Sequence, residues 1–407
     1  MHAFSSQRRW LAIIITTFAL SGTADADPLT RARVIELARS KAPDVRIAQT
    51  RVAESRGALV GARVLLPENP VLEIEAGPRW SSDRTTDLDA VLAVPLQIGG
   101  RRGKRIASAE AQIDRDSHLT RDAQRDAVSA ALTAYYRTVY AKARVELAKA
   151  RKQLADDLQK TASDRKKAGD VAQLEVNVAG AEVARAESEI LAEHANLSRA
   201  RGQLAIVLGL RDSESLDVDG RLDDRAAFDA LAGAPSTERA DVAAARAEIR
   251  SASSEVALAD AQRLPDLSLR LGYRREGADD VILGGLAISL PFFERGQGQR
   301  AQARVRRERA TIELDTKQAT AAVQVDTARA AYRATVDAVK KLDEQGLPLA
   351  VQNEQMSGES YKAGKIDLST LLLVRREALD TRREHLDRQL EAALAGVELS
   401  SAMGVTP

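Results

Sequence analysis

The chain repeats itself once, and this internal duplication limits the folds open to it more than any other feature. Short segments of the first half return in the second half at a nearly constant spacing of 195 to 198 residues. The matched pairs are Pro43-Asp44-Val45 with Ala240-Asp241-Val242, Leu66-Pro67 with Leu264-Pro265, Val94-Pro95-Leu96 with Leu290-Pro291-Phe292, and Ala168-Gly169-Asp170-Val171 with Ala363-Gly364-Lys365-Ile366. Because such a period is the mark of a duplicated structural unit, the sequence predicts two similar halves joined by a linker.

The first 26 residues have the pattern of a secretory signal peptide. Arg8 and Arg9 precede an apolar run over residues 10–20, and small residues follow over 24–26. About 11 apolar residues are too few for the ~20 that cross a bilayer as a helix. We therefore expect residues 1–26 to be removed on export to the cell envelope.

Composition narrows the function classes. The chain has no cysteine, which excludes disulfides, thiolate metal sites, cysteine nucleophiles and a lipidated cysteine. With 60 basic and 59 acidic residues the net charge is +1, so the overall charge does not favour nucleic acid. An aromatic content of only 3% favours long, closely packed helices over one large globular core.

Helical periodicity dominates both halves. A first helical stretch over about 29–66 is interrupted at Pro43, and a stretch over about 103–167 has no proline and keeps a four-three-four apolar spacing. About 65 helical residues would extend roughly 100 Å. After Gly169 apolar residues recur every seven positions, at Val176, Val183, Ile190, Leu197 and Leu204. The sequence therefore predicts a helical hairpin in each half, about 103–209 and 300–404, with tip turns at Gly169 and Gly364.

Each half also contains two runs in which apolar and polar residues alternate. The runs cover about 70–80, 86–97, 266–275 and 280–290. At about 9 to 11 residues each, they have the length of a tilted strand that crosses a membrane, with apolar groups toward lipid and polar groups toward a lumen. Four strands cannot close a barrel, and lipid tolerates no open sheet edge, so several copies must combine their strands.

Large aromatic residues flank these runs. Trp80 and Tyr273 are expected near one membrane face, and Phe292 and Phe293 near the other, as interfacial anchors. Two other interpretations stay open at this point, namely a coiled-coil hairpin protein and a soluble amphipathic β-hairpin in each half.

Together, these features resemble the TolC-like outer membrane factors of tripartite efflux and secretion systems. Residues 66–75, 94–102 and 168–177 look most like the branch that serves heavy-metal RND efflux pumps for cobalt, zinc, cadmium or copper. The resemblance implies a mainly α protein with a membrane β-barrel: a homotrimer with a 12-stranded barrel in the outer membrane of a Gram-negative bacterium, continued by an α-helical tunnel in the periplasm.

The same resemblance implies a domain plan and a set of partners. Residues 27–210 would be the first repeat, 211–239 an equatorial linker with short elements near 216–218 and 226–231, and 240–407 the second repeat. The tips would meet a periplasmic adaptor, which connects to an inner-membrane RND pump. The expected function is passive conduction of divalent heavy-metal cations, with drug efflux, type I protein secretion, and a periplasmic scaffold or adaptor as alternatives.

No residue pattern favours an enzyme, a cofactor or a resident metal. The histidines lack paired ligand spacing. Glu73 and Glu75 occupy alternate strand positions that would face a lumen, which explains them without catalysis. Two basic clusters near residues 101–105 and 304–309 are typical of a solvated helix face, with a collar near lipid headgroups as the alternative.

Acidic residues near the tip turns are candidates for the periplasmic gate. The family commonly carries acidic residues six and nine positions beyond the glycine of the second copy, and here these positions hold Thr370 and Leu373. The first-copy equivalent is Glu175, and Asp170 and Asp367 lie nearer the turns. Symmetry-related carboxylates on one axis would repel each other and attract cations, so these three residues are the candidate gate, with a solvated helix glutamate as the alternative for Glu175.

Overall fold

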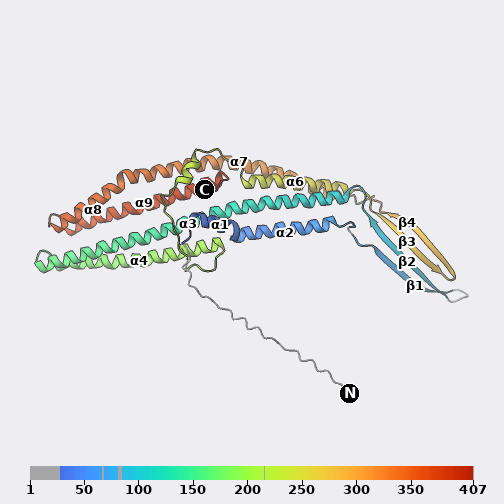
Figure 1. The fold of residues 1–407 in the computed structure, drawn as a ribbon, viewed down its shortest axis with the longest axis horizontal. Helices are drawn as coiled ribbons and strands as arrows, with labels where there is room; N and C mark the ends of the chain where they lie inside the picture. Colours follow the sequence, from blue (N-terminus) through green and yellow to red (C-terminus); the bar gives the residue numbers. More distant parts are fainter. Residues whose placement is uncertain (1–27, 67, 81–84, 215, 407) are drawn as a thin grey trace, which may run out of the picture.

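The protein is elongated, with a β-sheet at one end and two helical tips at the other (Figure 1). The computed structural model describes residues 28–66, 68–80, 85–214 and 216–406. The expected signal peptide over 1–26 lies outside the described residues. Among the described helices, none is both long and apolar enough to cross a membrane.

The two halves show the same order of elements. The first half contains α1 (Arg31–Lys41), α2 (Pro43–Arg63), β1 (Val71–Arg79), β2 (Thr85–Leu96), α3 (Arg101–Ala168) and α4 (Gln173–Leu208). The second contains α6 (Ala240–Ala261), β3 (Leu267–Glu276), β4 (Asp279–Ile288), α7 (Gln297–Lys341), the π-helical turn η1 (Leu342–Gly346), α8 (Leu347–Lys362) and α9 (Leu368–Ala402). The strand ends differ from the expected bounds by one or two residues.

The helices form a single layer, and the sheet lies beyond one end of it (Figure 1). Contacts between neighbours give the order α2, α3, α6, α7 in the half nearest the sheet, and the hairpins α3–α4 and α8–α9 extend away from it (Figure 1). The sheet is antiparallel with strand order β1-β2-β3-β4. The first repeat therefore supplies one side of the layer and the second repeat the other, with β2 and β3 meeting in the middle.

The second hairpin departs from the uninterrupted helix that the sequence suggests. Between α7 and α8 the five residues of η1 form a π-helical turn, and the Leu347 N–H donates to the carbonyl of Leu342. Pro348 lacks the N–H that would bond to the carbonyl of Glu344, so a regular helix cannot continue through this point. The first copy has no proline in its long helix and stays continuous.

The main core lies at the equator, where the linker and both chain ends meet the helices. Helix α5 (Ala226–Ala232) inserts Phe228, which is fully buried, between the rings of Tyr136 and Tyr332 at 6.1 and 6.3 Å. A side chain at Gly396 would collide with the Phe228 ring, so glycine allows this insertion. The linker also bonds to the chain ends, because Leu29 N–H donates to Asp217 and Thr237 N–H to Met403.

Candidate functional site

The sheet has one apolar face and one charged face. Directly opposite residues in an antiparallel pair point to the same side. The register places Leu72 opposite Leu92, and Leu92 opposite Leu271. The same face carries Ile74, Ala76, Leu88, Ala90, Val94, Leu96, Leu267, Leu269, Tyr273, Ile282, Leu286 and Ile288.

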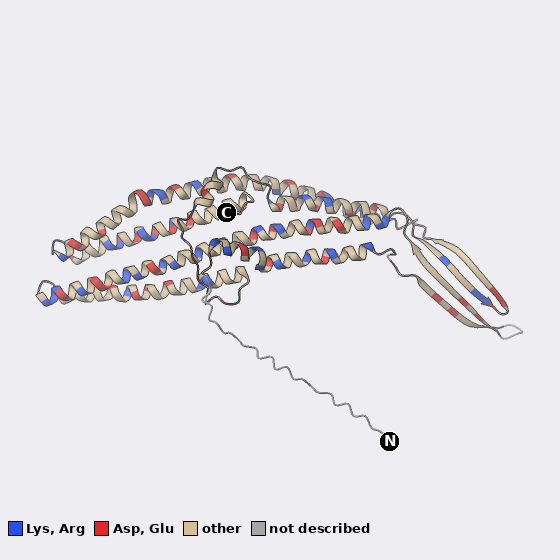
Figure 2. Ribbon diagram, viewed as in Figure 1, with Lys and Arg blue, Asp and Glu red and all other residues tan. Residues whose placement is uncertain are grey.

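The opposite face carries most of the charges of the sheet. Its charged members are Glu73, Glu75, Arg79, Asp87, Asp89, Arg270, Arg274, Glu276 and Asp279, whereas Arg275 and Asp280 lie at the far end of the apolar face. Arg274 pairs with Asp89 at 2.8 Å and Arg79 with Asp87 at 2.9 Å. Figure 2 shows these few charges on the strands beside the dense charges along the helices. The sheet is therefore built to separate an apolar medium from an aqueous one.

The two outer edges of the sheet are open. In the part of the chain that the structure describes, β1 pairs only with β2, and β4 only with β3. An open edge presents unpaired N–H and C=O groups, which lipid cannot satisfy. The wall that this sheet forms must therefore continue in another chain if it lies in a membrane.

The four aromatic candidates lie at two levels of the sheet. Trp80 follows the last residue of β1 at the end far from the helices, and its side chain is exposed. Tyr273 lies in the same half of the sheet and donates to Asp280 Oδ1 at 2.7 Å. Phe292 and Phe293 lie between β4 and α7, at the helical end, and both are exposed. The two pairs thus lie toward opposite ends of the sheet, and their role as membrane anchors stays a prediction.

The arginines of the first basic cluster bind backbone carbonyls of neighbouring helices. Arg101 donates to backbone carbonyls at the end of α6, including that of Ala261 at 3.2 Å. Arg102 donates to Arg63 O at 2.9 Å, and Arg105 to Val64 O at 2.8 Å. The carbonyls at a helix C-terminus lack helical partners, and guanidinium groups satisfy them here. These arginines therefore join the start of α3 to the ends of α2 and α6, while Arg102 and Lys104 stay exposed to solvent.

At the other end, glycines with left-handed backbone make both tip turns. Gly169 ends α3 with φ 87°, and Gly364 follows α8 with φ 70°. Asp170 is exposed beside the first turn. Asp367 is the N-cap of α9 and accepts hydrogen bonds from Ser369 Oγ at 2.6 Å and Thr370 N–H at 2.9 Å. These bonds lower the pKa of Asp367 to about 2, which keeps it ionised.

Glu175 connects the two hairpins. Tyr361 on α8 donates its hydroxyl to Glu175 Oε2 on α4 at 3.1 Å, and Arg165 lies over the Tyr361 ring at 4.9 Å. Burial and the bond to Glu175 raise the pKa of Tyr361. No sequence pattern singled out Tyr361, because the duplication does not preserve it. The corresponding residue of the first copy is Lys166. The structure brings Glu175 to the contact between hairpins and leaves Asp170 and Asp367 outside it.

A second polar contact joins the hairpins nearer the equator. Arg144 on α3 pairs with Glu193 on α4 at 2.6 Å, and both side chains are more than nine-tenths buried. Arg144 also donates to Tyr140, whose hydroxyl donates to Asp387 on α9. Glu193 was detectable in the sequence, because it interrupts a series of small residues at every seventh position, Ala179, Ala186 and Ala200.

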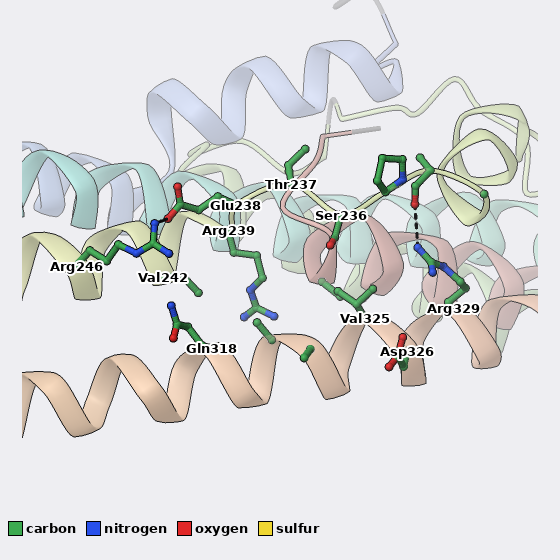
Figure 3. Close-up of a pocket in the computed structure, with 16 residues that line it drawn as sticks. Ser236, Thr237, Glu238, Arg239, Val242, Arg246, Gln318, Val325, Asp326 and Arg329 are labelled. Carbon is green, nitrogen blue, oxygen red and sulfur yellow. Dashed lines mark hydrogen bonds and ion pairs between the residues drawn. The ribbon is translucent and has the colours of Figure 1, made fainter.

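A groove with a volume of about 990 Å³ lies at the equator between the linker, α6 and α7 (Figure 3). Within it, Arg246 pairs with Glu238 at 2.5 Å, and Arg329 donates to the carbonyl of Ala234 at 2.9 Å. Among the described residues, no three His, Asp or Glu side chains gather closely enough to hold a metal ion. The groove is open and lacks a convergent set of polar groups.

Comparison with known proteins agrees with this architecture. The family model "Outer membrane efflux protein" matches residues 34–210 and 236–405, which are the two repeats. The cobalt-zinc-cadmium resistance protein CzcC of Cupriavidus metallidurans is 26% identical over 378 residues, covering 89% of this chain and 86% of the relative.

Solved structures share the fold. The outer membrane protein VceC from Vibrio cholerae superposes with a TM-score of 0.72 at 20% identity, over 92% of this chain and 96% of that one. CusC, described as undergoing conformational changes during folding and transmembrane channel formation, gives 0.71 at 19% identity, over 92% of both chains. These likenesses show a TolC-like fold with a helical tunnel and a β-domain.

Proposed function

This chain belongs to the outer membrane efflux protein family, and from that premise we propose that it is the exit channel of a tripartite efflux system. One observation carries the proposal. A four-stranded sheet with one apolar and one charged face continues into a single layer of long helices, and both the sheet and the layer have open edges. The chain is thus one segment of a wall and not a closed unit.

Three copies would close this wall. Four strands per chain give a 12-stranded barrel in the outer membrane, with the charged face toward the lumen, and the helices would form a tunnel in the periplasm. Trp80 and Tyr273 would lie at one membrane face, and Phe292 and Phe293 at the other. The hairpin tips would meet a periplasmic adaptor and, through it, an inner-membrane RND pump. Migration of the purified protein as a monomer would refute this assembly.

The substrate that we propose is a divalent heavy-metal cation. The similarity to the cobalt-zinc-cadmium resistance protein supports this choice, together with the family resemblance of residues 66–75 and 94–102. Deletion of the gene should sensitise the host to zinc, cobalt, cadmium or copper more than to hydrophobic antibiotics, and the intact gene should restore resistance. The opposite profile would favour a drug-efflux channel with the same fold.

Glu175 is the residue we propose for the gate. It is half-buried between the hairpins, and in a trimer three such carboxylates would surround one axis and attract cations. Glu175→Gln should reduce cation selectivity and block by divalent ions in planar bilayer recordings. The control is Glu187→Gln, because Glu187 lies farther along α4 and pairs only loosely with Lys152 at 3.6 Å. Unchanged selectivity and block in Glu175→Gln would falsify this assignment.

A further inference from the structure

The duplication gives a direct view of how neighbouring repeats meet at the junction between sheet and helices. Within the chain, the segment from β2 to α3 of the first repeat contacts the segment from α6 to β3 of the second. Leu264 packs against Gly99, where an added side chain would collide with it. Arg101 completes the contact, because it donates to the carbonyls of Ala261, Gln262 and Leu264 and pairs with Asp266. We call this contact the internal seam.

The same two kinds of segment occur once more, but they lie at opposite edges of the layer. The segment from β4 to α7 (289–296) lies at one edge and the segment from α2 to β1 (64–70) at the other, as Figure 1 shows. The duplication aligns Gly100 with Gly296 and Leu264 with Leu66. Both of these glycines have left-handed backbone angles and immediately precede a helix. The chain therefore contains both halves of a second seam that it cannot close itself.

The residues at this second seam differ from those of the internal seam. Gly99 is matched by Arg295, and Arg101 by Gln297, so neither the glycine that receives a leucine nor the carbonyl-binding arginine is present. Exposed apolar residues lie close to these positions instead. Phe293 is 93% exposed and Phe292 67% exposed, and at the opposite edge Leu65 is 72% and Val64 51% exposed.

The loop that carries the two phenylalanines is held in a fixed shape. Arg295 donates to the carbonyl of Pro291 at 3.1 Å, Gln297 donates to the carbonyl of Phe293 at 3.0 Å, and the Gly296 N–H donates to Glu294 Oε1 at 2.7 Å. Exposed aromatic side chains on an ordered loop at one edge, together with exposed aliphatic side chains at the other edge, are typical of a protein interface.

We propose that Phe292 and Phe293 pack on Val64 and Leu65 of a second copy of this chain. The contact is head-to-tail, because different surfaces meet, and head-to-tail contacts form a ring when the rotation between copies closes. The contact replaces the arginine clamp of the internal seam by apolar burial. The proposal rests on the ring assembly proposed above. It states that the two phenylalanines contact a neighbouring chain and not lipid, while they stay at the level of the membrane face.

The absence of cysteine from the chain makes a cross-linking test clean. The double variant Leu65→Cys/Phe293→Cys, treated with a short bis-maleimide in native membranes, should give covalent dimers and trimers on a denaturing gel. The matched control is Leu191→Cys/Phe293→Cys, because Leu191 is equally exposed but lies on α4 toward the tip. This control should stay monomeric on the denaturing gel.

A second measurement separates the protein partner from lipid. A nitroxide attached to the single variant Phe293→Cys should show low collision rates with both oxygen and a water-soluble relaxant, because the neighbouring chain covers it. High oxygen accessibility, together with no cross-links in a protein that still forms trimers, would overturn the inference and assign the loop to lipid. If the unmodified chain does not form trimers, the proposed channel itself fails, so the two failures are distinguishable.

Discussion

An arginine placed on the apolar face of the sheet tests the membrane orientation directly. Leu271 lies near the middle of β3, is half-exposed, and stands opposite Leu92 and Gly284 in the register. On the lipid face of a barrel, an arginine near the bilayer midplane costs ~2 to 4 kcal/mol. Since 1.4 kcal/mol is a factor of ten, Leu271→Arg should lower the equilibrium constant of insertion per chain by roughly 30- to 700-fold.

The chain offers a closely matched control. Leu283 lies on the neighbouring strand β4, opposite Gly272. It is one residue pair away from the pair of Leu271 and Gly284, and its side chain therefore lies on the charged face at nearly the same depth. Leu283→Arg adds the same side chain to the proposed lumen, where water solvates it, and should cost less than ~1 kcal/mol.

The assay is the yield of heat-modifiable trimer in the outer membrane fraction at equal expression. We expect little trimer from Leu271→Arg and nearly normal yield from Leu283→Arg. Equal yields, or a larger loss from Leu283→Arg, would show that the apolar face does not contact lipid.

Three further predictions concern the helical part. Glu193→Ala should destabilise the protein by about 3 to 5 kcal/mol in denaturant unfolding, because it leaves a buried guanidinium unpaired, whereas removal of the exposed Glu146 should cost less than ~1 kcal/mol; similar losses would contradict the burial argument. The fold lowers the pKa of Asp367 from 3.8 to about 2, so its stabilising effect is present above pH 4 and disappears as the pH falls toward 2. The melting temperature of Asp367→Ala should therefore lie below that of the wild type at pH 7 and converge with it near pH 2; a gap independent of pH would contradict this. Tyr361→Phe removes the hydroxyl that donates to Glu175 and so loosens the contact between the hairpins near the tip, which should raise single-channel conductance. An unchanged conductance would show that this contact does not hold the tip closed.

The sequence by itself determined the duplication, the helical hairpins and the alternation of the strands. Each of these is a local or periodic property, which can be recognised from a few consecutive residues or from the comparison of two short segments. The alternation also assigned the apolar side chains to one face, because the period of a strand is two and the register preserves it. The interruption at η1 was local as well, and Pro348 was its available signal.

Only the tertiary structure decided which polar residues act between segments. Arg101 reaches carbonyls 160 to 163 residues away, Arg144 meets Glu193 across a hairpin, and Tyr361 meets Glu175 across both repeats. Apart from Glu193, which interrupts a series of small residues, these residues look in sequence like the many other charged or aromatic positions of amphipathic helices. Their roles depend on the height at which two long helices pass each other, and that height is set by the packing of the whole layer, which no short window of sequence contains.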